Sequence, residues 1–227
     1  MDILLSKIRH EMGNAMTIVR CSLNVLKSEC PQVSETKYFD NVISELGYME
    51  NLLADMSFFN KRDEVNKEFI DIEKLITGVI ESSLGTEWVR DTKITMEKEN
   101  QDEIYMVKCD LLKVRQMLIN LIKNGAEAIG GTDKEGKIHI MLARKDNDIL
   151  ISVTDNGCGI EPADLNNIFE PFVTHKKDGT GIGLAIVKEV VDIHNGKIKV
   201  VSELGTGTTF EISLPINLVA GKTECLV

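Results

Sequence analysis

The sequence has no long hydrophobic run and no excess of basic charge. Its 227 residues carry a net charge of −10, and its uninterrupted apolar runs are only a few residues long. A membrane-spanning helix needs about 20 apolar residues, and nucleic acids or anionic membranes bind a basic face. The N-terminal stretch also becomes charged too soon for a signal peptide. We therefore expect a cytoplasmic globular chain, with no membrane span in it and no nucleic-acid partner.

Paired cysteines are also missing. The five cysteines form no Cys-x-x-Cys motif, and none clusters with histidine at the spacing of metal ligands. An odd number of cysteines without a pattern is typical of reduced thiols in a cytosolic protein. We therefore expect small buried side chains rather than a disulfide framework or a zinc site.

Proline is scarce, and residues 2–29 contain none. In this stretch apolar residues recur in alternating steps of four and three, and the same pattern returns after Pro31. The pattern predicts two helices of about 25 residues, joined as an antiparallel hairpin. Further apolar residues flank both seams, so one hairpin cannot cover them, and we expect a homodimer that completes a four-helix bundle. The seams are Ile8, Met12, Ala15, Val19, Ser22 and Leu26, then Val42, Leu46, Met49, Leu53 and Met56.

Beyond a polar linker the pattern changes to mixed helix and strand. We expect an α+β protein with two domains: the hairpin over 1–62, a linker over 63–68 and a second domain over 69–216. The tail, 217–227, has no clear pattern. The predicted helices are 70–84, 110–129, which Asp110 caps, and 181–194; the predicted strands are 93–99 and two hairpins over 136–157 and 196–215.

Four glycine- or asparagine-containing stretches stand out in the second part. They are NLIKNGAEA (120–128), DNGCGI (155–160), GTGIGLAIV (179–187) and GTGTTF (205–210). A Gly-x-Gly pair alone indicates only a turn. GTGIGLAIV indicates more, because it places flexible N–H groups at the start of a helix, where phosphates bind. No βαβ unit surrounds it and no Gly-x-x-x-x-Gly-Lys-Ser/Thr loop occurs, which excludes the common dinucleotide and P-loop folds.

In order and spacing, these stretches resemble the N, G1, G2 and final Gly-Thr boxes of the GHKL ATPase superfamily. The stretch IFEPFVTHKKDGTGIG adds the phenylalanine box of one branch, the sensor histidine kinases. The resemblance covers residues 68–216. It implies an α/β sandwich, with helices on one face of a mixed sheet, that binds ATP and Mg²⁺.

The resemblance also implies roles for single residues. Asn124 is similar to the asparagine that ligates Mg²⁺, with Asn120 one turn earlier on the same face. Asp155 resembles the carboxylate that accepts a hydrogen bond from the adenine amino group. The remaining implied nucleotide contacts are Gly157 and Gly159 against the base, Thr208 near the adenine, and Lys176, Lys177, Gly179, Gly181 and Gly183 in a lid over the phosphates.

A histidine near the N-terminus lies beside polar residues. His10 falls off the first apolar seam, next to Glu11 and one helical turn before Asn14. A lone histidine is most often a core residue, but its polar neighbours argue against that here. His-Glu-x-x-Asn at the head of a helical hairpin resembles the phosphoacceptor box of histidine kinases. The box commonly has arginine and proline where this chain has Gly13 and Ala15, which leaves the balance of kinase and phosphatase activity open.

That box implies the chemistry of the whole chain. His10 would attack the γ-phosphoryl group of ATP, Glu11 would accept or orient the proton on the other ring nitrogen, and Asn14 would orient a water. The expected function is an ATP-dependent protein histidine kinase that phosphorylates His10 and passes the phosphoryl group to an aspartate in a response regulator receiver domain. Dephosphorylation of that regulator is a further expected activity. Because His10 lies close to Met1, we expect the sensor in a missing segment or in a protein that acts in trans.

Three alternative functions remain open. A phosphorelay histidine phosphotransferase would use the same helical bundle with little ATPase activity. A GHKL serine kinase would act on another target and would lack the hairpin with its histidine box. A binding module would use the bundle only to dimerise.

Overall fold

The computed structural model describes residues 2–59, 65–89, 92–130, 132, 135–176 and 179–216. The chain divides into two compact units, of which the first contains 1–65 and 168–186 and the second 66–167 and 187–227. The predicted boundary at residue 62 and the tail 217–227 lie outside the described residues. The predicted domain limits therefore stay predictions.

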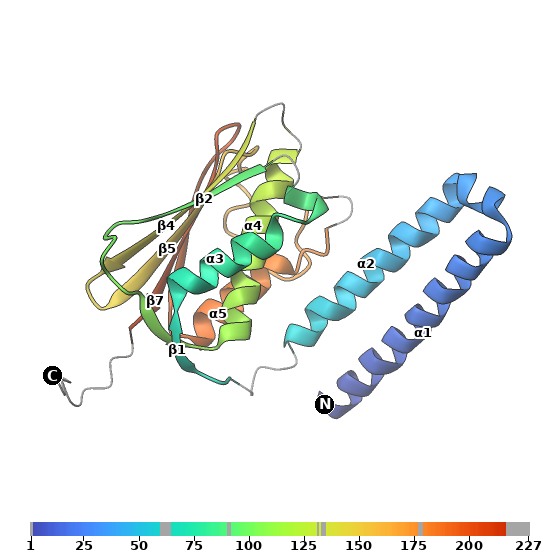
Figure 1. Ribbon diagram of the computed structural model, residues 1–227, viewed down its shortest axis with the longest axis horizontal. Helices are drawn as coiled ribbons and strands as arrows, with labels where there is room; N and C mark the ends of the chain where they lie inside the picture. The colour runs from blue at the N-terminus through green and yellow to red at the C-terminus, as the bar shows by residue number, and fades with distance from the viewer. Residues whose placement is uncertain are drawn as a thin grey trace. The chain divides into compact units, whose positions relative to one another are not determined.

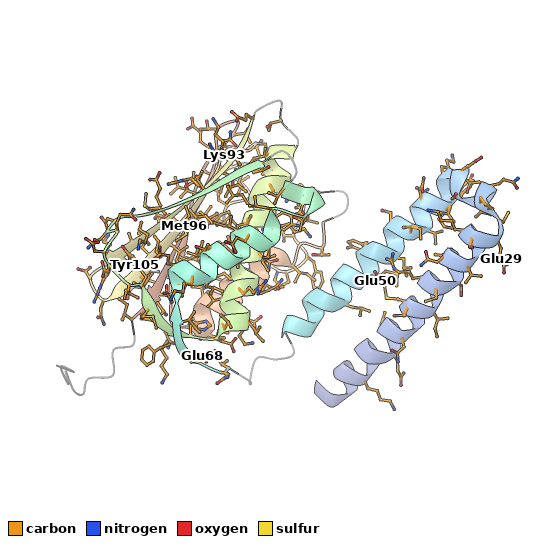
Figure 2. All side chains as sticks on the ribbon, in the orientation of Figure 1. Glu29, Glu50, Glu68, Lys93, Met96 and Tyr105 are labelled. Carbon is orange, nitrogen blue, oxygen red and sulfur yellow. The ribbon has the colours of Figure 1, made fainter. Side chains whose placement is uncertain are left out.

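The first unit contains an antiparallel helical hairpin, as the sequence predicts (Figure 1). Helix α1 spans Asp2–Glu29 and α2 spans Lys37–Phe59, and the 3₁₀ turn η1, Pro31–Glu35, joins them. A bidentate ion pair connects the helices: the Nε and Nη2 atoms of Arg20 lie 2.9 and 2.7 Å from the two carboxylate oxygens of Glu50. Figure 2 labels Glu50 on α2. Both side chains are about 38–39% exposed, so solvent screens the pair and it contributes little to stability.

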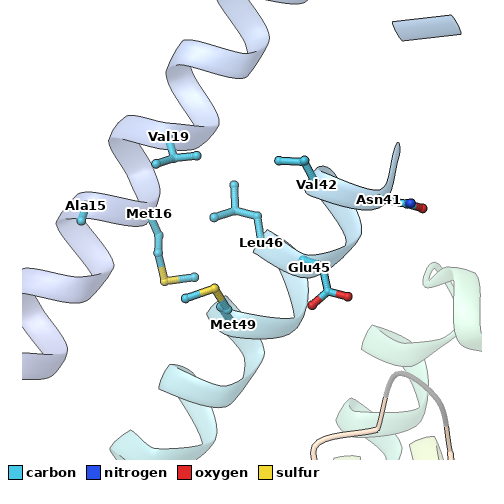
Figure 3. A pocket seen from close by; sticks show the side chains of 8 residues that line it. All are labelled: Ala15, Met16, Val19, Asn41, Val42, Glu45, Leu46 and Met49. Atoms are coloured by element: carbon cyan, nitrogen blue, oxygen red, sulfur yellow. The ribbon is translucent and has the colours of Figure 1, made fainter. Parts of the chain in front are cut away.

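The apolar seams of the hairpin are only half covered. Five residues of the predicted seams, Met12, Val19, Leu26, Val42 and Met49, are 41–46% exposed. An open groove of about 460 Å³ lies between the helices. Figure 3 shows apolar side chains from both helices pointing toward one another across it, while the Asn41 and Glu45 side chains point away. The lining residues are Ala15, Met16, Val19, Asn41, Val42, Glu45, Leu46 and Met49.

The second unit is built on a five-stranded mixed sheet with the strand order β2-β4-β5-β7-β6. Strand β2 is parallel to β4, and every other neighbouring pair is antiparallel. This confirms the predicted mixed sheet and both predicted hairpins. The strands are β2 Thr92–Lys98, β4 Gly136–Lys145, β5 Asp148–Asp155, β6 Lys197–Glu203 and β7 Gly207–Pro215.

A second, two-stranded sheet was not predicted. It pairs β1, Glu68–Asp71, with β3, Met106–Cys109, in antiparallel register. The predicted linker end at residue 68 therefore already belongs to a strand. Tyr105, labelled in Figure 2, lies just before β3 and is completely buried.

The helices are α3, Ile72–Ser83, α4, Leu111–Gly130, and α5, Gly183–Ile193. A short 3₁₀ turn, η2, spans Glu87–Val89. Helix α4 packs on β4 and β5 and also contacts α3, so α3 and α4 lie over one face of the sheet (Figure 1). Within the described residues, no helix has both the length and the apolar composition that a membrane span requires.

The cysteines only partly follow the prediction. Cys109 is buried, and burial raises the pKa of its thiol to about 12, so it stays protonated. Cys21 and Cys158, however, are exposed. The expectation of buried side chains is therefore wrong for these two, because Cys21 lies on a helix face and Cys158 in a loop.

A buried histidine ties the start of α4 to the end of α5. Asp110 caps α4, as predicted, because its Oδ1 accepts hydrogen bonds from the N–H groups of Leu112 and Lys113 at 3.0 and 3.1 Å. The N–H of Asp110 donates to Nε2 of His194 at 2.9 Å, and His194 is only 2% exposed. Since Nε2 accepts, the ring proton sits on Nδ1, which donates to the carbonyl oxygen of Val190 at 2.7 Å. Burial, as the main cause, lowers the pKa of His194 below its ordinary value of 6.5.

We predict that His194 makes the second unit less stable in acid. The folded pKa lies below the unfolded value, so its contribution to stability is complete above about pH 6.5 and is lost as the pH falls through the folded pKa. His194→Gln should lower the free energy of unfolding near neutral pH by about 1 kcal/mol or more. It should also remove that part of the pH dependence. Urea unfolding across this range checks both; an unchanged acid slope in the variant would contradict the assignment.

Candidate functional site

Two buried polar residues lie opposite each other at one end of the large sheet. Strands β5 and β7 alternate strictly between buried and partly exposed residues. On the buried side the alternation runs from Ile151 and Val153 to Asp155, and Thr208 is the direct partner of Asp155 across the strands. Their exposed fractions are 7% and 3%. Burying a carboxylate beside an apolar core is costly unless it has partners, so this position indicates a site rather than packing.

The loop after Asp155 is tightly enclosed. The N–H of Gly157 donates to Oδ1 of Asp155 at 2.8 Å, which folds the loop back on the carboxylate. A Cβ on Gly157 would lie 2.8 Å from the backbone of Ala128 in α4. Gly159 has a φ of +73°, and a Cβ there would lie 2.3 Å from the carbonyl oxygen of Glu203. Both positions therefore require glycine, and the loop lies between α4 and the β6–β7 turn.

Two residues that the sequence reasoning missed hold this loop in place. The Ser202 hydroxyl accepts from the N–H of Ile160 at 2.8 Å and lies 2.9 Å from Oγ1 of Thr208. Asn156 fastens the other end, because its side chain accepts from the N–H of Lys137 at 2.8 Å and donates to the carbonyl oxygen of Glu135 at 2.9 Å. Asn156 stands inside the DNGCGI stretch and could have been found there. The sequence does not indicate the role of Ser202, because this serine looks like any polar residue of an alternating strand.

Helix α4 presents two amides near the same loop. Asn120 and Asn124 lie four residues apart, on one face of the helix. Gly125 follows, and a Cβ there would lie 3.1 Å from Cβ of Asp155, so the helix lies against the carboxylate. Asn120 is 8% exposed, and within the described residues its Nδ2 has no hydrogen-bond partner. An orphaned buried donor costs about 1–3 kcal/mol, and a ligand acceptor such as a phosphate oxygen would satisfy it.

The amide oxygens of α4 could bind Mg²⁺ only if a bound ligand supplied further oxygen atoms. Across the part of the chain that the structure describes, no group of three His, Cys, Asp or Glu residues could hold a metal ion. Asn124 is half-buried and offers one amide oxygen. A hard cation bound there would take its other ligands from phosphates and water, as Mg²⁺ does in nucleotide sites.

The predicted lid residues belong to the first unit, whereas Asp155 belongs to the second. Gly181 has a φ of +66°, and a Cβ there would lie 2.6 Å from the backbone of Phe172, whose N–H donates to the Gly181 carbonyl oxygen at 2.9 Å. Gly179 lies close to Oγ1 of Thr174, and Gly183 is the first residue of α5. Lys176 is exposed, and Lys177 lies outside the described residues.

The predicted phosphoacceptor box lies on α1. Residues 10–14 are helical, so Asn14 follows His10 by one turn on the same face. Glu11 is exposed and lies 3.9 Å from Nζ of Lys7, while the side chain of His10 lies outside the described residues. Asn14 is also exposed. A Cβ on Gly13 would meet nothing within 4 Å, so this glycine leaves the helix face open.

Comparison with known proteins gives a consistent result. Residues 109–218 match the family described as histidine kinase-, DNA gyrase B- and HSP90-like ATPase. Sporulation kinase B of Bacillus subtilis (strain 168) is 31% identical over 217 residues, which cover 95% of this chain and 50% of that protein. The chain thus spans about half the length of this relative.

Two solved structures are similar as well. The catalytic domain of histidine kinase ThkA has 30% sequence identity and a TM-score of 0.57, with 66% of this chain and 96% of that domain covered. A structure of ThkA in complex with the response regulator protein TrrA has 25% identity and a TM-score of 0.66, with 94% of this chain and 61% of that chain covered.

We predict that the loop cannot accept a side chain at Gly159. Gly159→Ala would force a Cβ against the Glu203 carbonyl, so the loop must shift away from Asp155. Binding of a fluorescent ATP analogue should weaken by about tenfold or more, since a displacement near 1 Å can cost this much. Gly78→Ala is the matched control, because a Cβ there meets nothing within 4 Å in helix α3. Equal affinity in the two variants would contradict the site.

Proposed function

Because the chain belongs to the sensor histidine kinases of two-component signal transduction, we propose that it is an ATP-dependent protein histidine kinase that phosphorylates its own His10. The observation that carries this is the buried pair of Asp155 and Thr208, enclosed by a glycine loop and by α4. The carboxylate can accept a hydrogen bond and the hydroxyl can donate or accept one, which suits a ligand with an amino group beside a flat ring.

The residues around Asp155 suggest how the nucleotide is held. Asp155 accepts a hydrogen bond from the adenine amino group, and Thr208 lies beside it. Gly157 and Gly159 let the backbone approach the base. Asn120 donates its orphaned amide to a phosphate oxygen, and Asn124 ligates Mg²⁺, which neutralises phosphate charge when bound. The proposed cover of the phosphates consists of Lys176, Lys177, Gly179, Gly181 and Gly183.

The proposed chemistry at His10 is a phosphoryl transfer. A neutral imidazole nitrogen attacks the γ-phosphorus, the new N–P bond forms, and the bond to the β-phosphate oxygen breaks as ADP leaves. Glu11 accepts or orients the proton on the other ring nitrogen. The phosphotransferase alternative, with a decayed ATPase domain, is disfavoured because the loop still needs glycine at 157 and 159 and because Nδ2 of Asn120 still lacks a partner among the residues that the structure describes.

The acceptor assignment can be tested with γ-labelled ATP. His10→Gln should abolish labelling while leaving the affinity for an ATP analogue unchanged, because the pocket keeps every contact. Asp155→Asn is the complementary variant: it should weaken analogue binding, because an amide offers one acceptor oxygen and can turn a donor toward the adenine amine. Label that persists on His10→Gln would remove the central assignment.

We also propose that the phosphoryl group passes from His10 to an aspartate of a response regulator. The solved complex of ThkA with the response regulator protein TrrA supports this, since the similarity to that kinase covers 94% of the present chain. Asn14 lies one turn from His10 and is exposed to anything that docks there. Its amide can donate to and accept from one water, which would hold that water for attack on the regulator's aspartyl phosphate.

We predict that Asn14→Ala separates two activities. Labelling of His10 and forward transfer should stay within about twofold of wild type, because Asn14 has no part in either step. Stimulated dephosphorylation of the regulator should fall by about tenfold or more. The assay follows label on both proteins over time. A uniform loss of all three activities would instead mean that Asn14 only supports the helix around Gly13.

The hairpin supports a homodimer. Its seam residues are close to half exposed and line an open groove, so a single chain leaves them in water. Covering apolar surface contributes about 25 cal/mol for each Å² removed from water. A second hairpin with the same seams completes a four-helix bundle. Sedimentation equilibrium that found only monomer at assay concentration would contradict this.

A further inference from the structure

The first described residues of the second unit are held by a cluster of hydrogen bonds. The N–H of Asn66 donates to Oδ2 of Asp110 at 3.0 Å. The next residue, Lys67, donates from Nζ to the carbonyl oxygen of Ile193 at 2.7 Å. Asp110 also donates its N–H to His194, which follows Ile193. We call the connected group of Asn66, Lys67, Asp110 and His194 the entry clasp.

The entry clasp joins three segments of the chain at one point. Asp110 uses both carboxylate oxygens, with Oδ1 capping α4 and Oδ2 holding Asn66. Lys67 holds the last residue of α5, where a cation is favoured by the helix dipole. His194 connects the other two segments through the N–H of Asp110. The incoming chain is therefore fastened to the start of α4 and to the end of α5.

Lys67 is not needed to end α5 or to fill the core. The helix has its own C-terminal turn, in which the N–H of Gly196 donates to Val191 and that of Asn195, with a φ of +55°, donates to Asp192. Lys67 is only half-buried, and its ammonium donates to the carbonyl oxygen of Ile193, which is not one of the acceptors of these turn hydrogen bonds. The turn therefore closes without Lys67, whose bond fixes where the chain enters.

The two helices that the clasp joins carry residues of the proposed nucleotide site. Asn120 and Asn124 lie on α4, and α5 begins at Gly183 directly after the glycine segment. The fastened chain is the one that leads in from the hairpin with His10. We propose that Lys67 is a positioning residue for phosphoryl transfer: through the entry clasp it holds the chain that comes from the phosphoacceptor hairpin at a fixed point on α4 and α5. This inference rests on the proposed kinase function.

The test separates nucleotide affinity from transfer rate. Lys67→Met keeps the aliphatic stem but removes the donor to Ile193, whereas every contact around Asp155 remains. Affinity for a non-hydrolysable ATP analogue should therefore stay within about twofold of wild type. The rate of His10 labelling at saturating Mg·ATP should fall by about tenfold, since transfer depends on alignment. Lys67→Arg, which can still donate to the carbonyl, should restore most of the rate.

Lys74→Met is the matched control. Lys74 also makes a polar contact within this unit, since its Nζ lies 3.3 Å from Oδ2 of Asp71, but it is exposed and lies outside the clasp. It should label at the wild-type rate. If Lys67→Met labels as fast as wild type, or loses affinity in proportion to its rate, the positioning role is overturned while the kinase function stands. Absence of label from the wild-type chain would overturn the proposed function and this inference with it.

Discussion

The burial of one carboxylate organises the second unit. Strand β5 places Asp155 on the same side as Ile151 and Val153, so the end of an apolar row is a charged group. Its neighbours are arranged around this constraint. Gly157 donates to it, Gly125 brings α4 against it, and Thr208 faces it across the strands. Removing any of these glycines would push backbone or helix away from the carboxylate.

The two compact units differ in how far they bury their apolar residues. The second unit has a closed core under α3 and α4, with a few buried polar residues that include Asp155 and Thr208. The hairpin has few buried residues and a half-exposed apolar seam, with the Arg20–Glu50 pair setting the helices against each other. The proposed roles of the two units fit these different designs, because one would hold a ligand and the other would present a side chain to partners.

The sequence predicted the elements that have a strong local pattern. Both hairpins of the large sheet, the long helices and the Asp110 cap follow from periodicity and capping. Strands β1 and β3 were missed because each has four residues and exists only by pairing with the other. Ser202 and Lys67 could not be identified, since their roles depend on contacts 42 and 126 residues away in the chain.

The central claim is that the nucleotide site proposed around Asp155 delivers a phosphoryl group to a histidine nitrogen. The most direct measurement is ³¹P nuclear magnetic resonance of the chain after reaction with Mg·ATP and removal of nucleotide. The account predicts a protein-bound phosphoramidate signal that disappears on acidification and persists in base. A signal that survives acid and is lost in base would indicate a serine or threonine ester and would contradict it.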